Sequence, residues 1–253
     1  MAHRLVGKTA LVTGATSGLG RAIALAYAAE GARVAVAGRD ARRGACVVEE
    51  IATAGGRATF VPADLAAPTS AAARQLAHDA TEALGGRIDV LVNNAGVYPA
   101  PPTAQTDDET FDRVIAVNVR APFYLVAQLA PAMAERGGGT IVNIGSWAAT
   151  VGLPVGVLYA ASKAMLEQLT RGWAAEFGPA GVRVNTIAPG IIATEGNAGH
   201  TDALKPMVNR FPARRLGLPE EIAHAAVYLA SDEAAFMHGS TLLIDGGALT
   251  TRA

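Results

Sequence analysis

The chain has 253 residues, of which 51% are hydrophobic and 17% are charged, and its formal net charge is −1. This composition excludes a disordered chain, and the length predicts one large α/β domain, since no stretch resembles a linker. The near-neutral charge gives no reason to expect a nucleic acid or an anionic membrane as a partner, so we expect a small molecule.

Cys46 is the only cysteine in the sequence, which rules out an intramolecular disulfide and a thiolate cluster for zinc. The five histidines are scattered without ligand spacing, so we expect no metal chemistry. The apolar run near the N-terminus stops at Thr13 and is too short for a signal sequence or a membrane span, so we expect a cytoplasmic location.

The first predicted unit is a strand, a glycine-rich turn and a helix. A short apolar strand, Thr9–Val12, leads into a glycine cluster at residues 14–20, and an alanine-rich helix follows over Arg21–Glu30. Glycines let the backbone approach a pyrophosphate closely, and the helix N-terminus offers free N–H groups and a positive dipole end. The spacing is GxxxGxG rather than GxGxxG, so a tight turn without a ligand is the alternative.

The next predicted strand, Arg33–Ala37, ends at Gly38-Arg39-Asp40, where a dinucleotide-binding fold places the adenosine ribose. An acid near this position binds the ribose 2′-OH of NAD, whereas an arginine suits the 2′-phosphate of NADP. Arg39 therefore favours NADP(H), with NAD(H) as the alternative. Asp40 is either the N-cap of the next helix or a ribose ligand, and we favour the cap.

Strands and helices continue to alternate through the first half of the chain. The predicted elements are helix Ala41–Ala54, strand Arg57–Val61, helix Ser70–Leu84 and strand Ile88–Val92. Parallel strands joined by helices build a doubly wound sheet, which binds ligands beyond the carboxyl ends of its strands. Small and polar residues stand at these ends, including Asp64 and the turn at 93–96. Asp64 either binds the adenine amino group or caps a turn.

A long helical pattern covers Asp107–Arg136. Pro122 and Pro131 lie inside it, and we expect a kink or slight break there, because proline cannot donate the helical hydrogen bond. Asn118 lies in the middle of the pattern, where asparagine is unfavourable, so its side chain either faces solvent or binds a neighbour through its amide.

The stretch Thr140–Lys163 carries the most informative chemistry. A buried strand, Thr140–Ile144, is followed by Ser146, and Tyr159 and Lys163 then stand four residues apart on one helix face. A phenol has a pKa of about 10, and a neighbouring ammonium helps it to exchange protons at neutral pH. With Ser146 binding the substrate oxygen, the trio predicts a proton-transfer site for a carbonyl and alcohol pair. A tyrosine that only packs, beside a solvated lysine, is the alternative.

The second half of the chain completes the alternation. The predicted elements are helix Tyr159–Phe177, strand Val182–Ala188, helix Pro219–Ala230 and strand Ser240–Ile244. Residues 191–215 show no clear period, which is typical of a substrate-binding loop or lid.

Together these motifs resemble the classical short-chain dehydrogenase/reductase family over Lys8–Gly247. The matching motifs are residues 13–20, Asn93-Asn94-Ala95-Gly96, Asn118, Ser146, Tyr159-Ala160-Ala161-Ser162-Lys163, Pro189-Gly190 and Asp245-Gly246-Gly247. The resemblance implies a single Rossmann-type domain with a doubly wound parallel sheet of about seven strands and helices on both faces. It also implies an NAD(P)-dependent oxidoreductase acting on CH–OH groups, and a homotetramer that packs through the helices of residues 107–136 and 159–177.

The resemblance assigns roles to four catalytic residues. Tyr159 is the general acid in ketone reduction and the general base in alcohol oxidation, and Lys163 lowers its pKa and binds the nicotinamide ribose. Ser146 polarises the substrate oxygen, and Asn118 holds a water that links Lys163 to solvent. The implied cofactor-binding set, Tyr159 and Lys163 included, is completed by Gly14, Thr16, Ser17, Gly18, Leu19, Gly20, Arg39, Asp64, Leu65, Asn94, Ala95, Gly96, Pro189, Gly190, Ile192 and Thr194.

Cofactor choice depends on three positions in this comparison. Gly38 stands where NAD-preferring relatives carry an acid, and Arg39 stands where NADP-preferring relatives often carry a base. Ser17 occupies the position at which some NADP-dependent relatives place a base in the glycine turn. NADP(H) remains the favoured cofactor.

The predicted substrate pocket is mostly apolar, which suits a hydrophobic or mixed ketone. Its residues are Ser146, Trp147, Leu153, Tyr98 and Ile191. Arg210, Arg214 and Arg215 could attract an anionic acyl carrier or could form a solvated face, so a 3-oxoacyl-thioester (acyl carrier protein) reductase is one alternative. An NAD-dependent alcohol dehydrogenase is another, and a dinucleotide-binding sensor without turnover is a third, against which the complete catalytic set argues.

Overall fold

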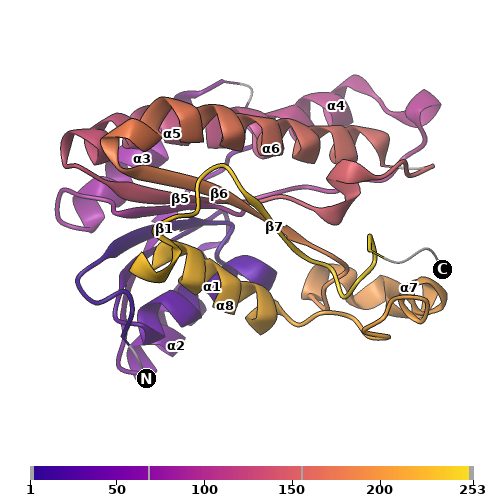
Figure 1. The fold of residues 1–253 in the computed structure, drawn as a ribbon, viewed down its shortest axis with the longest axis horizontal. Coiled ribbons are helices and arrows are strands. Elements are labelled where there is room, and N and C mark those ends of the chain that lie inside the picture. The colour runs from indigo at the N-terminus through magenta and orange to yellow at the C-terminus, as the bar shows by residue number, and fades with distance from the viewer. Residues whose placement is uncertain (1–2, 68, 155, 251–253) are drawn as a thin grey trace.

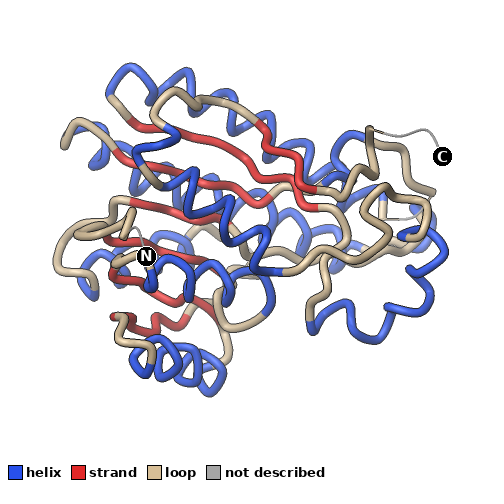
Figure 2. Tube along the Cα trace, turned by 60° about the horizontal axis from the view of Figure 1, so that its bottom comes forward, coloured by secondary structure: helices blue, strands red, loops and turns tan. Residues whose placement is uncertain are grey.

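The computed structural model describes residues 3–67, 69–154 and 156–250. Within these residues seven strands form one parallel sheet in the order β3-β2-β1-β4-β5-β6-β7, and Figure 2 shows them side by side in red. The strands are β1 (Thr9–Thr13), β2 (Arg33–Gly38), β3 (Arg57–Pro62), β4 (Val90–Asn93), β5 (Gly139–Ile144), β6 (Val182–Pro189) and β7 (Thr241–Ile244). The predicted parallel sheet of about seven strands is therefore confirmed.

The direction of winding reverses between β1 and β4. From β1 the chain moves outward to β2 and β3, then returns to the other side of β1 as β4 and continues outward to β7. Leu11 of β1 is in register with Ala35 of β2 on one side and with Leu91 of β4 on the other. Doubly wound sheets bind ligands at the carboxyl edge beside such a reversal.

Helices cover both faces of the sheet (Figure 1). One layer contains α1 (Gly18–Ala29), α2 (Ala41–Thr53) and α8 (Pro219–Ala230), and the other contains α3 (Ala71–Ala83), α4 (Asp108–Ile115), α5 (Ala121–Glu135) and α6 (Val157–Phe177). The central strands read as continuous apolar runs because both of their faces are buried.

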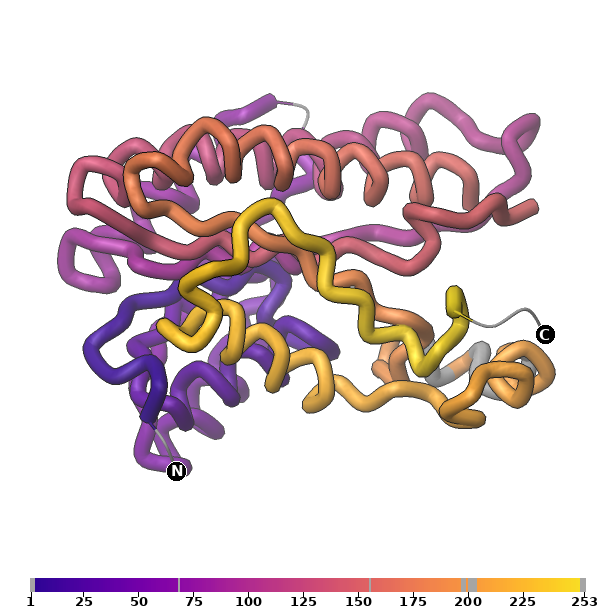
Figure 3. The backbone as a smooth tube through the Cα atoms, viewed as in Figure 1, coloured from indigo at the N-terminus to yellow at the C-terminus, as the bar shows by residue number. Residues whose placement is uncertain are grey.

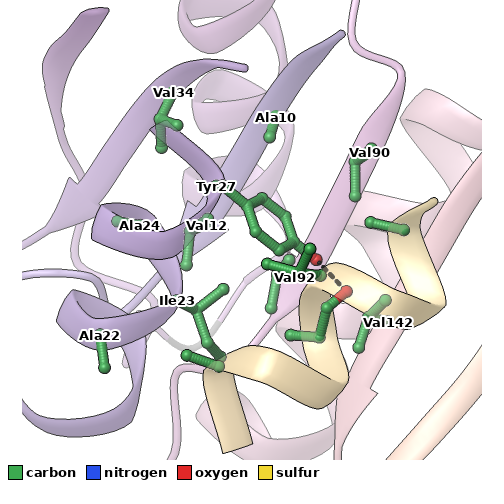
Figure 4. Close-up of a cluster of buried hydrophobic side chains, with 14 of the residues drawn as sticks. Ala10, Val12, Ala22, Ile23, Ala24, Tyr27, Val34, Val90, Val92 and Val142 are labelled. Atoms are coloured by element: carbon green, nitrogen blue, oxygen red, sulfur yellow. Dashed lines mark hydrogen bonds between the residues drawn. The ribbon is translucent and has the colours of Figure 1, made fainter. Parts of the chain in front are cut away.

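Tyr27 of α1 lies at the centre of the first layer, among valines from β1, β2 and β4 (Figure 4). Its ring is fully buried, and its hydroxyl donates a hydrogen bond of 3.0 Å to the carbonyl oxygen of Ala226 in α8. A buried phenol without such a partner would cost free energy. This bond therefore ties the two helices together beneath the sheet.

The helical run that begins at Asp108 is interrupted by a π-helical turn at Ala116–Arg120. We expected a kink or slight break in this run because of Pro122 and Pro131. The structure has a break at the π-helical turn, which ends two residues before Pro122, and α5 continues through Pro131. The wide turn surrounds Asn118.

The run Asp108–Glu135 is long and apolar enough to cross a membrane by length and composition alone, with a mean hydropathy of 1.3. Inside the fold, however, 61% of that apolar window is buried. A helix that forms part of a globular core has the same features.

The segment 191–215, which we expected to lack regular structure, contains a 3-10 turn at Glu195–His200 and helix α7 (Thr201–Val208). Pro206 inside α7 and the glycines before it obscure the helical period in the sequence. The segment is held at both ends, because Ala193 N donates to Gly217 O at 2.8 Å and Ala213 N donates to Gly246 O at 3.0 Å. Figure 3 traces this path, with the yellow chain after β7 passing along the orange segment.

Candidate active site

A cavity of about 560 Å³ follows the carboxyl edge of the sheet. It is lined by residues that come directly after β1, β2, β3, β4, β5 and β6. The predicted cofactor and catalytic residues in its wall are Gly14, Thr16, Ser17, Gly18, Leu19, Arg39, Asp64, Leu65, Asn94, Ala95, Gly96, Ser146, Tyr159, Lys163, Pro189, Gly190, Ile192 and Thr194. Gly20 and Asn118 are the two members of these sets that lie outside the lining.

The glycine turn after β1 packs tightly against the turn after β4. Gly14 has a left-handed φ of +63°, and a Cβ on it would lie 2.9 Å from Ala95 Cα. A Cβ on Gly20 would overlap Gly14 O and Asn94 Nδ2. Asn94 Nδ2 itself donates to Thr13 O at 2.8 Å. Gly20 therefore serves the contact between the two turns rather than the wall of the cavity.

The first turn of α1 lies at the edge of this cavity. Ser17 is the N-cap, and its side chain makes no capping hydrogen bond. The first N–H groups of a helix have no intrahelical partner, so those of α1 are free for another acceptor. Together with the left-handed φ of +52° at Gly18, they form a cradle of the kind that binds a phosphate at a helix N-terminus.

Arg39 lies at the end of β2, exposed and in the cavity wall. The neighbouring Gly38 is packed by Thr16, because a Cβ on Gly38 would lie 2.6 Å from Thr16 Cγ2. Among the described residues no carboxylate forms an ion pair with Arg39. A cationic side chain without a protein partner thus faces the end of the cavity beside the β2 terminus.

The two acids near this end both make local hydrogen bonds. Asp40 Oδ1 accepts from Arg43 N at 3.0 Å, so it caps α2, and the cap that we favoured is confirmed. Asp64 Oδ1 accepts from Ala66 N at 3.1 Å and also lines the cavity. Asp64 therefore closes a turn, and its contact with an adenine amino group remains a prediction.

Ser146, Tyr159 and Lys163 meet at the opposite end of the cavity. Ser146 begins a 3-10 turn after β5, and its Oγ accepts from Ala148 N at 3.2 Å. Lys163 Nζ donates to Ile144 O at 2.7 Å and lies 5.9 Å from the centroid of the Tyr159 ring. Three side chains from two elements thus face one another, as the spacing predicted.

Gly96 leaves the room that Lys163 occupies. A Cβ on Gly96 would lie 3.4 Å from Lys163 Nζ and 3.6 Å from Asn118 Oδ1. A Cβ at position 96 would thus be in van der Waals contact with both groups, and a longer side chain would compete with them for space. The glycine of the turn after β4 therefore contributes to the catalytic end of the cavity.

Burial affects the protonation of both groups. It raises the pKa of Tyr159, and the hydrogen bond with Ser146 lowers that pKa by a smaller amount. Burial lowers the pKa of Lys163 to about 8, from an ordinary value of 10.5. Lys163 is not among the groups that shift the pKa of Tyr159 in this structure, so its predicted effect on Tyr159 remains a prediction.

Asn118 is fully buried, and its amide binds neighbours rather than solvent. Its Oδ1 accepts from Val97 N at 2.9 Å, and its Nδ2 donates to Val97 O at 2.9 Å and to Ser162 Oγ at 3.0 Å. The side chain thus connects the π-helical turn to the loop after β4 and to α6. The water-holding role that the resemblance implies remains a prediction.

The predicted substrate residues all line the cavity near Ser146. They are Tyr98, Trp147, Leu153 and Ile191. Tyr98 stands edge-on to Tyr159, with ring centroids 6.4 Å apart, and Trp147 is backed by Phe211, with ring centroids 6.1 Å apart. The wall is thus built from the loop after β4, the turn after β5 and the segment after β6.

Several lining residues were missed by the sequence analysis. Among them are Arg113 in α4, Val117 in the π-helical turn, and Gly196, Leu204 and Met207 in the segment after β6. The i, i+4 spacing of Arg113 and Val117 was a usable signal that they share one helix face. The other three had none, because the segment showed no period and its helix was not expected.

The three arginines proposed to attract an acyl carrier are not equivalent. Arg215 forms a two-point ion pair with Glu221, at 2.8 and 2.6 Å, and this contact lowers the pKa of Glu221 to about 2. All three arginines lie outside the cavity lining. An anionic carrier would therefore have to compete with Glu221 for Arg215.

Comparison with known proteins places these features in a family. A family model described as enoyl-(acyl carrier protein) reductase matches residues 14–249. D-threitol dehydrogenase of Mycolicibacterium smegmatis is 43% identical over 251 residues, which cover 96% of this chain and 94% of that protein. A solved short-chain dehydrogenase/reductase family protein is 44% identical, with a TM-score of 0.90 over 98% of this chain and 100% of that one. The chain belongs to the short-chain dehydrogenase/reductase family.

A further solved structure is similar to this chain and holds a cofactor. It is the 3-oxoacyl (acyl-carrier-protein) reductase of Agrobacterium tumefaciens C58 with NADP bound, which is 33% identical, with a TM-score of 0.92 over 97% of this chain and 96% of that one. The chain is thus an oxidoreductase that acts on CH–OH groups with a nicotinamide dinucleotide.

Proposed function

We propose that this protein transfers a hydride between NADP(H) and a ketone or secondary alcohol, with Tyr159 as the general acid and base. The observation that supports this most directly is the meeting of Ser146, Tyr159 and Lys163 at one end of the cavity. The other end carries a helix N-terminus and a cation. A sensor without turnover would need the second feature and not the first.

Proton transfer follows from the hydrogen bonds of the three side chains. Ser146 Oγ accepts from Ala148 N, so its own proton is available to a substrate oxygen. In ketone reduction Tyr159 delivers a proton to that oxygen, and in alcohol oxidation it removes one. The bound nicotinamide supplies or accepts the hydride.

Lys163 keeps a positive charge close to the tyrosine. At neutral pH a group with a pKa of about 8 is mostly charged. One of its three protons is donated to Ile144 O, which leaves two for the nicotinamide ribose and for Tyr159. When Tyr159 loses its proton, this charge stabilises the phenolate.

The residues along the cavity fit a dinucleotide. The backbone at Gly14 and Gly18 and the free N–H groups of α1 would hold the pyrophosphate, because the turn lines the cavity and Ser17 makes no capping hydrogen bond to these N–H groups. Asp64 and Leu65 would border the adenine, and Pro189, Gly190, Ile192 and Thr194 would cover the nicotinamide.

In this proposal Arg39 binds the 2′-phosphate, which NADP(H) carries and NAD(H) lacks, and the protein therefore favours NADP(H). Arg39 has no ion-pair partner among the described residues and lies in the wall next to the β2 terminus. Gly38 has no side chain, so no acid stands where a ribose 2′-OH would be bound. The Thr16 methyl group lies 2.6 Å from the position that a Cβ at residue 38 would take. An arginine in this position suits a phosphate.

The substrate end suits a ketone or secondary alcohol with an apolar body. Among its described lining residues Trp147, Leu153, Ile191, Leu204 and Met207 are apolar. D-threitol dehydrogenase is named for a polyol, which suggests that a substrate of this chain carries more than one oxygen. The second candidate is a 3-oxoacyl-thioester reductase, supported by the similar reductase with NADP bound, and the pairing of Arg215 with Glu221 argues against it.

Segment 191–215 acts as a substrate lid in this proposal. Residues from it line the cavity at Ile191, Leu204 and Met207, and hydrogen bonds at both of its ends fix where it leaves and rejoins the fold. Four copies of the chain assemble into a homotetramer through α4, α5 and α6, which expose Phe111, Phe123 and Met165. A cytoplasmic location remains a prediction.

The experiment that tests the catalytic proposal is the substitution Tyr159→Phe. We expect the turnover of NADPH with carbonyl compounds to fall by at least about 10³-fold, because general acid and base catalysis typically contributes a factor of this order. NADPH affinity, measured by fluorescence titration, should stay within about threefold of the wild type. Turnover at the wild-type rate in this variant would refute the mechanism.

A further inference from the structure

Tyr98 places a second phenol in the catalytic end of the cavity. It lies in the loop after β4, about half of it is exposed, and its ring stands edge-on to that of Tyr159 at 71°. The contact is close enough for Tyr98 to be one of the groups that raise the pKa of Tyr159, after burial. Nothing in the catalytic chemistry described above uses its hydroxyl.

The hydroxyl of Tyr98 has no hydrogen-bond partner among the residues that the structure describes. Its nearest neighbour from the lid is Gly196, on which a Cβ would overlap Tyr98 Oη. Gly196 also lines the cavity. The lid therefore passes close to the hydroxyl only because residue 196 lacks a side chain.

The rest of the substrate wall provides few alternatives for a polar substrate atom. Trp147, Leu153, Ile191, Leu204 and Met207 bring apolar surface, and Ser146 and Tyr159 are committed to the reacting oxygen. A buried polar group on a ligand without a partner costs binding free energy, so any second oxygen must find a donor or acceptor here. The hydroxyls of Thr16, Ser17 and Thr194 also line the cavity, and Tyr98 Oη, which can donate and accept, is the one whose ring packs against the reacting Tyr159.

We propose that Tyr98 Oη binds a second oxygen of the substrate, so that the preferred substrates are diols and hydroxyketones on an otherwise apolar frame. This inference rests on the proposed function of the site. Oxidation converts one CH–OH into a carbonyl, with the hydride passing to the oxidised nicotinamide and the hydroxyl proton to Tyr159. The second hydroxyl, held by Tyr98, is unchanged, so the product of a diol is a hydroxyketone.

The test compares two probe alcohols, cyclohexanol and cyclohexane-1,2-diol, with NADP⁺ and the full chain. The wild type should show a higher kcat/KM for the diol. Tyr98→Phe keeps the ring and removes the hydroxyl, so it should lower kcat/KM for the diol by about tenfold more than for cyclohexanol, as expected for the loss of one hydrogen bond. Tyr228→Phe removes a phenol outside the cavity and should leave the ratio of the two probes unchanged.

The outcomes separate the inference from the function on which it rests. If the wild type oxidises both probes and Tyr98→Phe leaves their ratio as it was, the inference is wrong and the proposed function stands. If Tyr98→Phe also weakens NADP(H) binding, its effect is structural and the inference is again wrong. If the wild type binds NADPH and oxidises neither probe, both are contradicted.

A second variant tests the contact between the lid and Tyr98. Gly196→Ala places a methyl group where Tyr98 Oη lies, so it should displace the hydroxyl and reduce the diol preference in the same direction as Tyr98→Phe. Gly199 has open space where its Cβ would lie, so Gly199→Ala is the matched control in the same segment. Equal effects of the two glycine substitutions would contradict the contact.

Discussion

Lys163 is a cation enclosed in the fold, with the carbonyl of Ile144 as its hydrogen-bond acceptor. Burial holds its pKa at about 8 in the folded protein, below the ordinary value of 10.5. Between these two pH values the unfolded chain binds more protons at this position than the folded chain does. The contribution of Lys163 to stability therefore rises with pH across this window and is lowest below pH 8.

We predict that replacing Lys163 with methionine removes this rise. The free energy of unfolding of the wild type should increase between pH 8 and 10.5 relative to that of the variant, by an amount on the order of 3 kcal/mol. Urea unfolding of the cofactor-free protein at several pH values measures it. Lys8→Met, at a partly exposed lysine, should keep the wild-type slope, and the same slope in both variants would contradict the prediction.

The charge of Arg39 should affect the affinity for the cofactor, which a binding assay can measure. Arg39→Ala should weaken the binding of NADPH by about 10- to 100-fold and leave that of NADH nearly unchanged, because only NADPH carries the 2′-phosphate. Fluorescence titration with each cofactor measures the preference. Arg42→Ala is the control, because Arg42 lies in the first turn of α2, three residues after Arg39, and outside the cavity lining. A wild type that binds NADH more tightly would instead identify a neighbour that reads the ribose hydroxyl.

At the scale of the element, the π-helical turn is stabilised from outside the helix. Asn118 makes three hydrogen bonds, two with the backbone of Val97 and one with Ser162. Asn118→Ala should lower the free energy of unfolding by about 2–4 kcal/mol, because these groups would lose their partner inside the fold. Urea unfolding measures it, with the exposed Asn209→Ala as control. A loss below about 1 kcal/mol would mean that water replaces the amide.

The same turn illustrates what local sequence can and cannot predict. The strands were found because buried parallel strands are continuous apolar runs, and the site was found because polar residues follow them at one edge. A π turn depends on the partner that Asn118 meets across the fold, and helix α7 is hidden by Pro206. Leu204 and Met207 could not be assigned for that reason, since their place in the wall depends on how the lid folds back.

At the scale of the whole molecule, the proposed tetramer can be tested on the outer face of α4 and α6. Phe111 and Met165 are about half exposed in the single chain, at 49% each. Large exposed apolar side chains on neighbouring helices suit an interface between copies. Met165→Glu should therefore lower the mass in solution from that of four copies to that of two or one, measured by light scattering. Val6→Glu, an exposed apolar position far from these helices in the chain, should not, and a wild type that is monomeric would contradict the assembly.

The packing of Thr16 on Gly38 constrains the order in which a lineage could change its cofactor. An acid introduced at position 38 first meets the Thr16 methyl group, 2.6 Å from where its Cβ must lie. Thr16→Ser removes that methyl group and leaves Oγ, 3.1 Å from the Cβ position, as the nearest atom, so we expect the same acid to be better tolerated. The two substitutions are therefore epistatic, and a double-mutant cycle on NADH affinity should return a coupling different from zero. We expect the path to NAD that begins with Thr16→Ser to cost less stability than the reverse order, although both end at the same pair of residues.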